Sequence, residues 1–367
     1  MITGSARLDD IPRYEPGLTS AEVAERYGLE TVVKLASNES PHGPLPAVSE
    51  AIAAAAIGLN RYPDGSARVL RAALANLHGV DAAQVIVGNG SGELILMAGQ
   101  ALLDPGTTVV YADPSFALYA TLASASGAEG IAVPLAGHGL HDLDAMAAEV
   151  DERTRLVIVC NPNNPTSTVQ TSADVEQTVR TIKQRSPETG ILIDEAYLEY
   201  ATKPGAFTMA KLALELPGVF ISRTFSKAYG LAGMRIGYAI GQPETVRKVG
   251  NAWGLGSINE LQAVAGIAAL GDKAHMQWEK MENKRVRDWT QGQFKAMGFE
   301  SPESETNFIF VNIRRPAVEF RDGARALGVM VGRDFPPMEK TYARISLGRM
   351  EDMEKAMVVF KQVLGKA

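Results

Sequence analysis

The chain is poor in cysteine and in long apolar runs. Of its 367 residues, Cys160 alone is a cysteine, which excludes an internal disulfide framework and fits a reducing compartment. No uninterrupted apolar run approaches the roughly 20 residues that cross a bilayer, because Ser49 and Glu50 interrupt the alanine-rich segment that begins at Ala47. The N-terminal segment MITGSARLDDIPRYEPG lacks the apolar core of a signal peptide. We therefore expect a cytoplasmic protein that does not span a membrane.

An excess of positive charge is also missing. Lysine and arginine number 36 against 42 aspartate and glutamate residues, so the net charge is −6, and no basic run stands out. We therefore do not expect nucleic acid as a partner. Histidine is scarce as well, with five residues in all. His138 and His141 form an isolated H-G-L-H pair, too little for a metal site, so no metal is predicted.

Short β-branched runs alternate with helical patterns through the middle of the chain. Near-continuous apolar runs are typical of strands that helices cover on both faces, and their alternation with helices predicts an α/β fold with a mainly parallel sheet. Strands are expected to begin near residues 84, 107, 130, 155, 190, 218 and 235. After Ser257 a long helical stretch leads into two short strands, NFIFVNI and YARISLG, and a closing helix. We predict a large domain at 47–255 and a smaller α+β domain formed by 1–46 and 256–367.

Polar residues follow several predicted strands, at the edge where open α/β sheets bind ligands. GNGSGE (88–93) precedes a helix, and its backbone N–H groups suit a phosphate, although a tight turn that needs glycine explains it equally well. The dinucleotide motif G-x-G-x-x-G is absent, because Glu93 stands third after Gly90. Phe116 is either a core aromatic or a stacking face for a planar ligand. An asparagine of NPNNPTS either serves the turn or reaches a ligand oxygen.

Two charged residues follow further strands. Asp194 ends an apolar strand, and a buried carboxylate needs a partner, either a protonated ring nitrogen or a neighbouring cation. Lys227 lies in the small-residue stretch TFSKAYGLAGMRIG. In an apolar pocket its pKa would fall, which makes the amine competent for a Schiff base. Thr224 and Ser226 offer hydroxyl donors to a phosphate, and Arg235 offers a bidentate clamp. A phosphate cradle, a ring face, a counter-ion and a reactive lysine are the parts that hold pyridoxal phosphate.

The chain resembles the type I fold pyridoxal-phosphate-dependent aminotransferases and is most similar to the histidinol-phosphate aminotransferase family. The resemblance covers nearly the whole length, in KLASNESPHGP, NRYPDG, GNGSGE, NPNNPT, DEAY, TFSKAYGLAGMRIGY and ARISLG. It implies the type I fold, pyridoxal 5'-phosphate as cofactor and a homodimer with shared active sites. It also implies ping-pong transfer of an amino group from a donor, with histidinol phosphate as first choice, to a 2-oxo acid such as 2-oxoglutarate. These motifs specify the fold and cofactor more closely than the substrate.

The resemblance also implies roles for individual residues. Lys227 would bind the cofactor covalently and then transfer protons as general base and acid, while Asp194 would pair with the ring N–H. Phe116 would stack on the ring, and its 3-oxygen would bind Asn164 and Tyr197. The cofactor phosphate would be bound by Ser91, Gly92, Thr224, Ser226 and Arg235, and across the subunit boundary by Tyr62. The substrate would be bound by Tyr14, Asn38, Asn164, Arg344 and Arg333.

Several positions depart from the family pattern. Thr166-Ser167 stands where the family often has Thr-Gly, Ser40 changes NENP to NESP, and Arg349 follows RISLG where many relatives carry Thr or Ser. Relatives that bind histidinol phosphate tend to have arginine directly after the strand VMV, where this chain has Gly332 and then Arg333. A slip of one residue turns a side chain to the other face. Arg333 is therefore either a substrate ligand or a solvated arginine.

Other functions stay open at this stage. An aromatic or other amino acid is the alternative amino donor. A decarboxylase of the threonine-phosphate type shares the scaffold but would need no 2-oxo acid. A non-catalytic cofactor-binding protein is a third reading, against which the intact pair of Asp194 and Lys227 argues.

Overall fold

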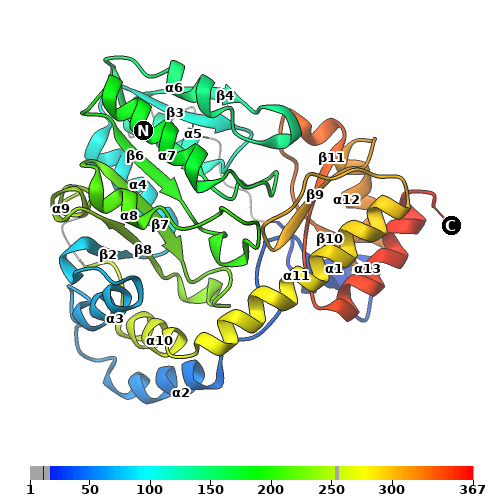
Figure 1. The fold of residues 1–367 in the computed structure, drawn as a ribbon. Helices are drawn as coiled ribbons and strands as arrows, with labels where there is room; N and C mark the ends of the chain where they lie inside the picture. The colour runs from blue at the N-terminus through cyan, green and yellow to red at the C-terminus, as the bar shows by residue number, and fades with distance from the viewer. Residues whose placement is uncertain (1–10, 12–16, 253–255, 367) are drawn as a thin grey trace, which may run out of the picture.

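The computed structural model describes residue 11 and residues 17–252 and 256–366. Its centre is a sheet in the order β2-β8-β7-β6-β5-β3-β4 (Figure 1). β8 runs antiparallel to both neighbours, and the other pairs are parallel. The strands are β2 (Val85–Gly88), β3 (Thr108–Asp113), β4 (Glu129–Pro134), β5 (Thr154–Cys160), β6 (Gly190–Asp194), β7 (Val219–Thr224) and β8 (Gly237–Gly241). The predicted strands and the mainly parallel sheet are confirmed.

Helices cover both faces of this sheet, as the apolar strands require. On β5, Leu156 and Ile158 pack toward the face that carries α4 (Ser91–Leu102), α5 (Leu118–Ser126) and α9 (Pro243–Gly250). Val157 and Val159 alternate with them and pack toward the opposite face. That second face is covered by α3 (Arg68–His78), α6 (Leu143–Ala148), α7 (Ser172–Arg185) and α8 (Ala210–Glu215). Because side chains alternate along a strand, each strand supplies two cores.

The remaining strands form two small sheets in the C-terminal part of the fold. β9 (Phe308–Asn312) pairs antiparallel with β11 (Tyr342–Ser346), and β1 (Val33–Leu35) pairs in parallel with β10 (Val329–Val331). The pairing of β1 brings the N-terminal segment beside residues 329–331. A separate core packs these strands against α11 (Lys273–Ala296), α12 (Ala317–Ala326) and α13 (Met350–Val363). α1 (Ser20–Tyr27) precedes β1.

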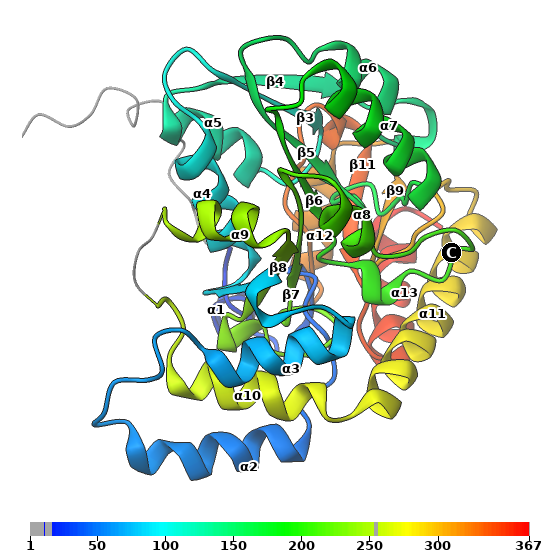
Figure 2. The same ribbon diagram turned by 60° about the vertical axis from the view of Figure 1, so that its left-hand side comes forward.

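The long helical stretch after Ser257 forms two helices. α10 (Glu260–Leu270) ends before Gly271, and Asp272 caps α11 by accepting a 2.8 Å hydrogen bond from the His275 N–H. α10 packs with α2 (Pro46–Ala55) and α3, as Figure 2 shows. Ala265 and Ala269 of α10 thereby join the core of the large sheet. The division into 47–255 and two flanking ranges stays a prediction about units of folding.

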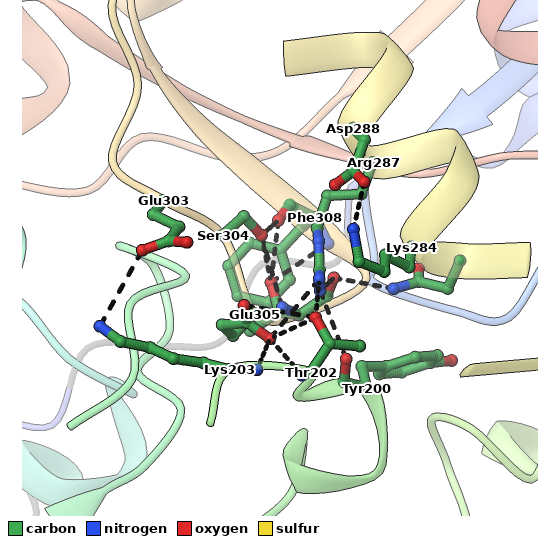
Figure 3. Close-up of polar contacts among 12 residues, drawn as sticks. Tyr200, Thr202, Lys203, Lys284, Arg287, Asp288, Glu303, Ser304, Glu305 and Phe308 are labelled. Carbon is green, nitrogen blue, oxygen red and sulfur yellow. Dashed lines mark hydrogen bonds and ion pairs between the residues drawn. The ribbon is translucent and has the colours of Figure 1, made fainter. Parts of the chain in front are cut away.

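A buried ion pair between α11 and the segment before β9 also binds the turn that follows β6. Arg287 of α11 is 2% exposed, and its Nη2 donates to Thr202 Oγ1 at 2.9 Å and lies 3.5 Å from Glu305 Oε2. The same carboxylate accepts the N–H groups of Thr202 and Lys203 (Figure 3). A buried charge is costly without such partners. These contacts therefore tie α11 to the segment carried by β6.

Two further properties of the described residues concern membrane-spanning helices and metal-binding clusters. None of the helices in the described part of the chain is long and apolar enough to cross a membrane. In that same part, no three His, Cys, Asp or Glu residues are grouped so that they could hold a metal ion.

Candidate active site

Asp194 lies at the carboxyl end of β6 and points toward the α4–α5 face. The side chain is buried, Tyr119 donates its hydroxyl to Oδ2 at 2.8 Å, and Ser222 donates to Oδ1 at 3.0 Å. Burial raises the pKa of the Asp194 carboxyl, whereas the two hydrogen bonds lower it. Asp194 and Ser222 are register partners on adjacent strands. The sheet thus orients a buried carboxylate that still lacks a cationic hydrogen-bond donor among the described residues.

Lys227 lies in the loop after β7, beneath the N-terminal segment. Its Nζ donates to the Asn38 carbonyl oxygen at 3.1 Å and to that of Ser37 at 3.5 Å, and lies 5.5 Å from the centre of the Tyr197 ring. Burial, followed by the positive charge of Arg344, lowers the pKa of the Lys227 amine to about 8. Near neutral pH this lowered pKa leaves a larger neutral fraction than an ordinary lysine has, which makes the amine a better nucleophile.

An anion cradle forms where the first turn of α4 meets the start of β8. A Cβ on Gly237 would lie 2.3 Å from the Ser91 nitrogen, so only glycine permits this approach of two backbones. Gly90 lies beside Arg235 Nη2 and has a φ of 84°, a conformation that favours glycine. Arg235 Nη1 donates to Ser226 Oγ at 3.2 Å, and Thr224 Oγ1 lies 3.0 Å from that oxygen. Within the described chain, Arg235 forms no ion pair with a carboxylate. A free guanidinium beside a helix N-terminus favours an anion.

Arg344 on β11 faces the loop after β5. Its Nη1 donates to Asn164 Oδ1 at 2.7 Å and its Nη2 to the Ala36 carbonyl oxygen at 2.9 Å. The guanidinium lies 5.5 Å from the centre of the Phe308 ring and 4.7 Å from that of Phe335. Its Nε is buried without a hydrogen-bond partner among the described residues. Burial lowers the pKa of Arg344 to about 10, so it stays a cation at neutral pH.

Asn38 connects the N-terminal segment to both parts of the site. Its Nδ2 donates to the Tyr197 hydroxyl oxygen at 3.2 Å, and its Oδ1 accepts from Ser346 Oγ at 2.7 Å. Burial raises the pKa of Tyr197 to about 12, so its hydroxyl keeps its proton and can donate to a ligand oxygen. Asn38 adopts the left-handed region with φ 53°, where asparagine is tolerated better than most residues.

The remaining predicted site residues lie in several environments. Ser91 and Gly92 are the first residues of α4, and Phe116 is partly buried with its ring edge-on to Tyr119 at 5.7 Å. Tyr62 is fully exposed. Arg333 is exposed as well, and its guanidinium lies 5.2 Å from the Phe335 ring centre. Tyr14 lies outside the described residues. The functional roles of all these residues stay predictions.

Three residues that contact the site were missed by sequence reasoning. Tyr119 and Ser222 bind Asp194, and Ser346 binds Asn38. The sequence could have indicated Ser222, because it is a polar residue inside the apolar run VFIS, two positions before Thr224 on the same strand face. The sequence offers no such indication for Ser346, since it contacts Asn38 across 308 positions of sequence.

A family model described as aminotransferase class I and II matches residues 30–360. The chain belongs to the class I and II aminotransferases. It is 37% identical to a histidinol-phosphate aminotransferase of Moorella thermoacetica over 96% of this chain and 91% of the relative. It is also 37% identical to an aromatic amino acid aminotransferase of Thermobifida fusca over 96% of this chain and 94% of that relative. The chain is thus an enzyme, and its aminotransferase activity is the one shared by the family.

Solved structures agree with this assignment. A histidinol-phosphate aminotransferase from Sinorhizobium meliloti, solved in complex with pyridoxal-5'-phosphate, superposes with a TM-score of 0.87 at 25% identity, over 99% of each chain. A second structure, described as a putative histidinol-phosphate aminotransferase from Erwinia carotovora atroseptica, superposes with a TM-score of 0.86 at 26% identity, over 90% of this chain and 95% of the other. The type I aminotransferase fold is therefore confirmed.

The cofactor of this aminotransferase is pyridoxal 5'-phosphate, and the residues present fit it. The cradle at Arg235 offers cationic and helix-terminal donors to a phosphate, and the buried Asp194 carboxylate suits a protonated ring nitrogen. The lowered pKa of Lys227 suits a lysine that binds an aldehyde. When bound, the cofactor supplies an electron sink that acidifies the C–H bond next to the substrate nitrogen.

Proposed function

We propose that this aminotransferase takes histidinol phosphate as amino donor and a 2-oxo acid such as 2-oxoglutarate as acceptor. The observation that carries the proposal is the similarity to relatives of that name. Relatives from Moorella thermoacetica, Symbiobacterium thermophilum and Brevibacillus brevis are 37%, 36% and 35% identical over at least 96% of this chain. The buried guanidinium of Arg344 supports it, because it stays a cation at neutral pH and forms no ion pair with a carboxylate among the described residues, which suits an anionic substrate group.

Each site residue has a separate role in the proposed reaction. Lys227 Nζ would take up the proton that leaves the substrate carbon and return it later, as general base and acid. Asp194 holds the ring N–H, with Tyr119 and Ser222 fixing its carboxylate. Tyr197 and Asn164 donate hydrogen bonds to the ring oxygen, while Arg344 fixes the substrate's anionic group. The phosphate is bound by Ser91, Gly92, Thr224, Ser226 and Arg235, with Phe116 against the ring and Asn38 and Tyr14 at the substrate pocket.

We further propose that the enzyme works as a cytoplasmic homodimer with shared active sites. The segment between α2 and α3 exposes Ile57, Leu59 and Tyr62, with exposures of 88%, 51% and 102%. Apolar side chains this exposed and this close in sequence favour burial against another surface. The fully exposed Tyr62 can then reach the phosphate cradle of the second subunit. Sedimentation of wild type and of the double variant Ile57→Glu/Leu59→Glu tests this point, because a shift to monomer is expected.

An aromatic amino acid is the second candidate donor. The Thermobifida fusca relative, an aromatic amino acid aminotransferase, is as similar in identity as the first histidinol-phosphate relative. Arg333 contacts the Phe335 ring from an exposed position, and Phe308 and Phe335 flank Arg344 with apolar surface. Aromatic rings beside a guanidinium suit a donor with an aromatic side chain and a carboxylate.

A half-reaction distinguishes the two donors. The holoenzyme is mixed with histidinol phosphate, phenylalanine, tyrosine or glutamate in separate samples without acceptor, and conversion of the cofactor to its amine form is followed by absorbance. Faster and tighter conversion by histidinol phosphate supports the proposal. If phenylalanine converts the cofactor and histidinol phosphate does not, the amino donor is an aromatic amino acid and the first proposal is wrong. The variant Arg333→Ala, measured with both donors, reports whether Arg333 contributes to phosphate binding.

A further inference from the structure

Glu279 is a buried carboxylate at which three separate segments meet. It lies in the first half of α11 with its side chain 2% exposed. Its Oε1 lies 3.1 Å from Ser40 Oγ of the N-terminal segment and accepts from the Tyr200 hydroxyl at 3.3 Å. Its Oε2 has no hydrogen-bond partner among the described residues, and His42 Nε2 lies 3.8 Å from it. Tyr200 ends η5 (Leu198–Tyr200), the short helix that follows Asp194 and Tyr197.

Glu279 belongs to a polar stripe on an otherwise apolar helix face. Glu279, Asn283 and Arg287 are four residues apart and all three are buried, so they share one side of the helix. Asn283 Nδ2 donates to the Thr306 carbonyl oxygen at 3.1 Å, and Arg287 makes the contacts drawn in Figure 3. Arg287 and Glu279 both contact the 200–202 segment, one at each end of the stripe. Buried polar groups are costly unless they hold partners in place.

The segment that Ser40 belongs to covers Lys227. The carbonyl oxygens of Ser37 and Asn38 accept hydrogen bonds from Lys227 Nζ, and the Asn38 side chain binds Tyr197. Further along, a Cβ on Gly230 would lie 3.2 Å from the His42 carbonyl oxygen, so the segment packs directly against the loop of Lys227. The position of residues 37–42 therefore sets the acceptors and the burial that Lys227 experiences.

We propose that Glu279 is a positioning residue of this aminotransferase, which fixes residues 37–42 over Lys227 by holding Ser40 and Tyr200 on one carboxylate oxygen. Ser40 and Tyr200 are far apart in sequence, and each is adjacent to groups that contact the active site. Ser40 is one of the positions at which this chain departs from the family pattern, so the contact is a feature of this chain's own residues. The functional part of the proposal rests on the role assigned to Lys227.

The chemistry of the contact predicts which substitution restores it. The shared atom is an acceptor, and glutamine keeps an acceptor oxygen at the same place. Burial raises the pKa of Glu279 to about 7, and Ser40 and Tyr200 both donate to the same oxygen, so what the contact requires is an acceptor at that place. Glu279→Gln should therefore preserve the position of residues 37–42, whereas Glu279→Ala should release it. Ser40→Ala removes one donor from the other side of the same contact.

Hydrogen exchange followed by mass spectrometry tests the positioning directly. The amides of Asn38 and His42 are protected by Ser346 Oγ at 2.8 Å and Ser40 Oγ at 3.1 Å. In holoenzyme and in cofactor-free protein, Glu279→Ala and Ser40→Ala should speed exchange in a peptide covering 37–42 by about tenfold or more. Glu279→Gln should match wild type. Asp288→Asn, an exchange on the same helix at an exposed residue paired with Lys284, is the matched control and should also match wild type.

A second readout connects the position of the segment to Lys227. The pH midpoint of the absorbance change of the lysine-bound cofactor should shift in Glu279→Ala and Ser40→Ala and return in Glu279→Gln. Unchanged exchange in both Ser40→Ala and Glu279→Ala overturns the proposal, and so does a Glu279→Gln variant that behaves like Glu279→Ala. If Glu279→Ala fails to fold, Tyr200→Phe decides, because it removes the other donor to Oε1 and leaves the acceptor of the His42 amide in place. If hydrogen exchange is faster but the pH midpoint is unchanged, Glu279 positions residues 37–42 without affecting Lys227. The functional part of the proposal then fails.

Discussion

Arg344 and Asn164 are joined by a 2.7 Å hydrogen bond from Nη1 to Oδ1, which connects β11 to the loop after β5. The bond brings the group proposed to bind the substrate next to a group proposed to bind the cofactor ring. Nη2 is fixed on the Ala36 carbonyl oxygen at the same time. A planar guanidinium can satisfy both acceptors at once, and the ammonium of lysine cannot reproduce that geometry.

Replacing Arg344 should therefore raise the KM for the amino donor. Arg344→Lys is expected to lower kcat/KM by about 10- to 100-fold, because a charged hydrogen bond contributes about 1.5–3 kcal/mol. Steady-state kinetics with the preferred donor measures the effect. Arg325→Lys, at an arginine on α12 paired with Asp322, is the matched control and should stay near wild type. A normal KM in Arg344→Lys would contradict the assigned role.

Lys227 should react with amine reagents at an unusually low pH. Its pKa is lowered to about 8 by burial and by the nearby charge of Arg344. In cofactor-free protein, the rate of modification of the Lys227 peptide should rise with a midpoint at about pH 8. Arg344→Gln should move that midpoint upward, because it removes a repelling positive charge. The exposed Lys211 provides the labelling reference in the same sample. A midpoint near that of a free lysine would contradict the prediction.

The hydroxyl of Tyr119 should support catalysis through Asp194. Tyr119→Phe removes a 2.8 Å donor to Oδ2, which raises the pKa of the buried carboxyl further and weakens its hold on a ring N–H. We expect kcat to fall by about 10-fold, and by about 100-fold or more in Asp194→Asn. Stopped-flow half-reactions measure both. The exposed Tyr27 offers the control Tyr27→Phe, which should leave kcat unchanged. A larger loss in Tyr119→Phe than in Asp194→Asn would contradict this order.

The strands and the charged residues at their ends could be predicted from the sequence, but the contacts between distant segments could not. The runs around Val157 and Ile191 are apolar at nearly every position, so their strands followed from the residues alone. Asp194, Lys227 and Arg235 were found because charges at strand ends are conspicuous. β1 was missed because it has three residues and exists only by pairing with β10.

The contacts of Asn38 show why the rest could not be predicted. Its partners Tyr197 and Ser346 are 159 and 308 residues away, and nothing in local composition specifies such pairs. The helix break at Gly271 was hidden for a different reason, since good helix formers stand on both sides of it, mainly alanine before and mainly charged and long-chain residues after, and the whole stretch reads as one helix. The orientation of Arg333 could not be predicted either, because a shift of one residue at a strand end decides which face of the strand a side chain occupies.

Acidification should destabilise the fold partly through His141. This histidine is buried, neither ring nitrogen has a hydrogen-bond partner among the described residues, and burial lowers its pKa to about 4. Between about pH 6.5 and about pH 4 the unfolded chain binds a proton there that the folded protein does not, so stability falls as pH falls. Relative to His141→Gln, wild type should lose up to about 1.4 kcal/mol per pH unit in this window.

Urea unfolding of wild type and His141→Gln with saturating cofactor provides that comparison. The exposed His138, replaced in His138→Gln, is the control and should follow wild type. Parallel pH dependence in wild type and His141→Gln would contradict the assignment of this acid sensitivity to His141.

The most direct measurement is the location of the cofactor on the chain. Holoenzyme is reduced with borohydride, digested, and searched by mass spectrometry for the peptide that carries the cofactor. The account predicts a single labelled peptide that contains TFSKAYGLAGMR, with the added mass on Lys227, and no label in Lys227→Ala. A label on another lysine, or an unlabelled Lys227 in active enzyme, would contradict it.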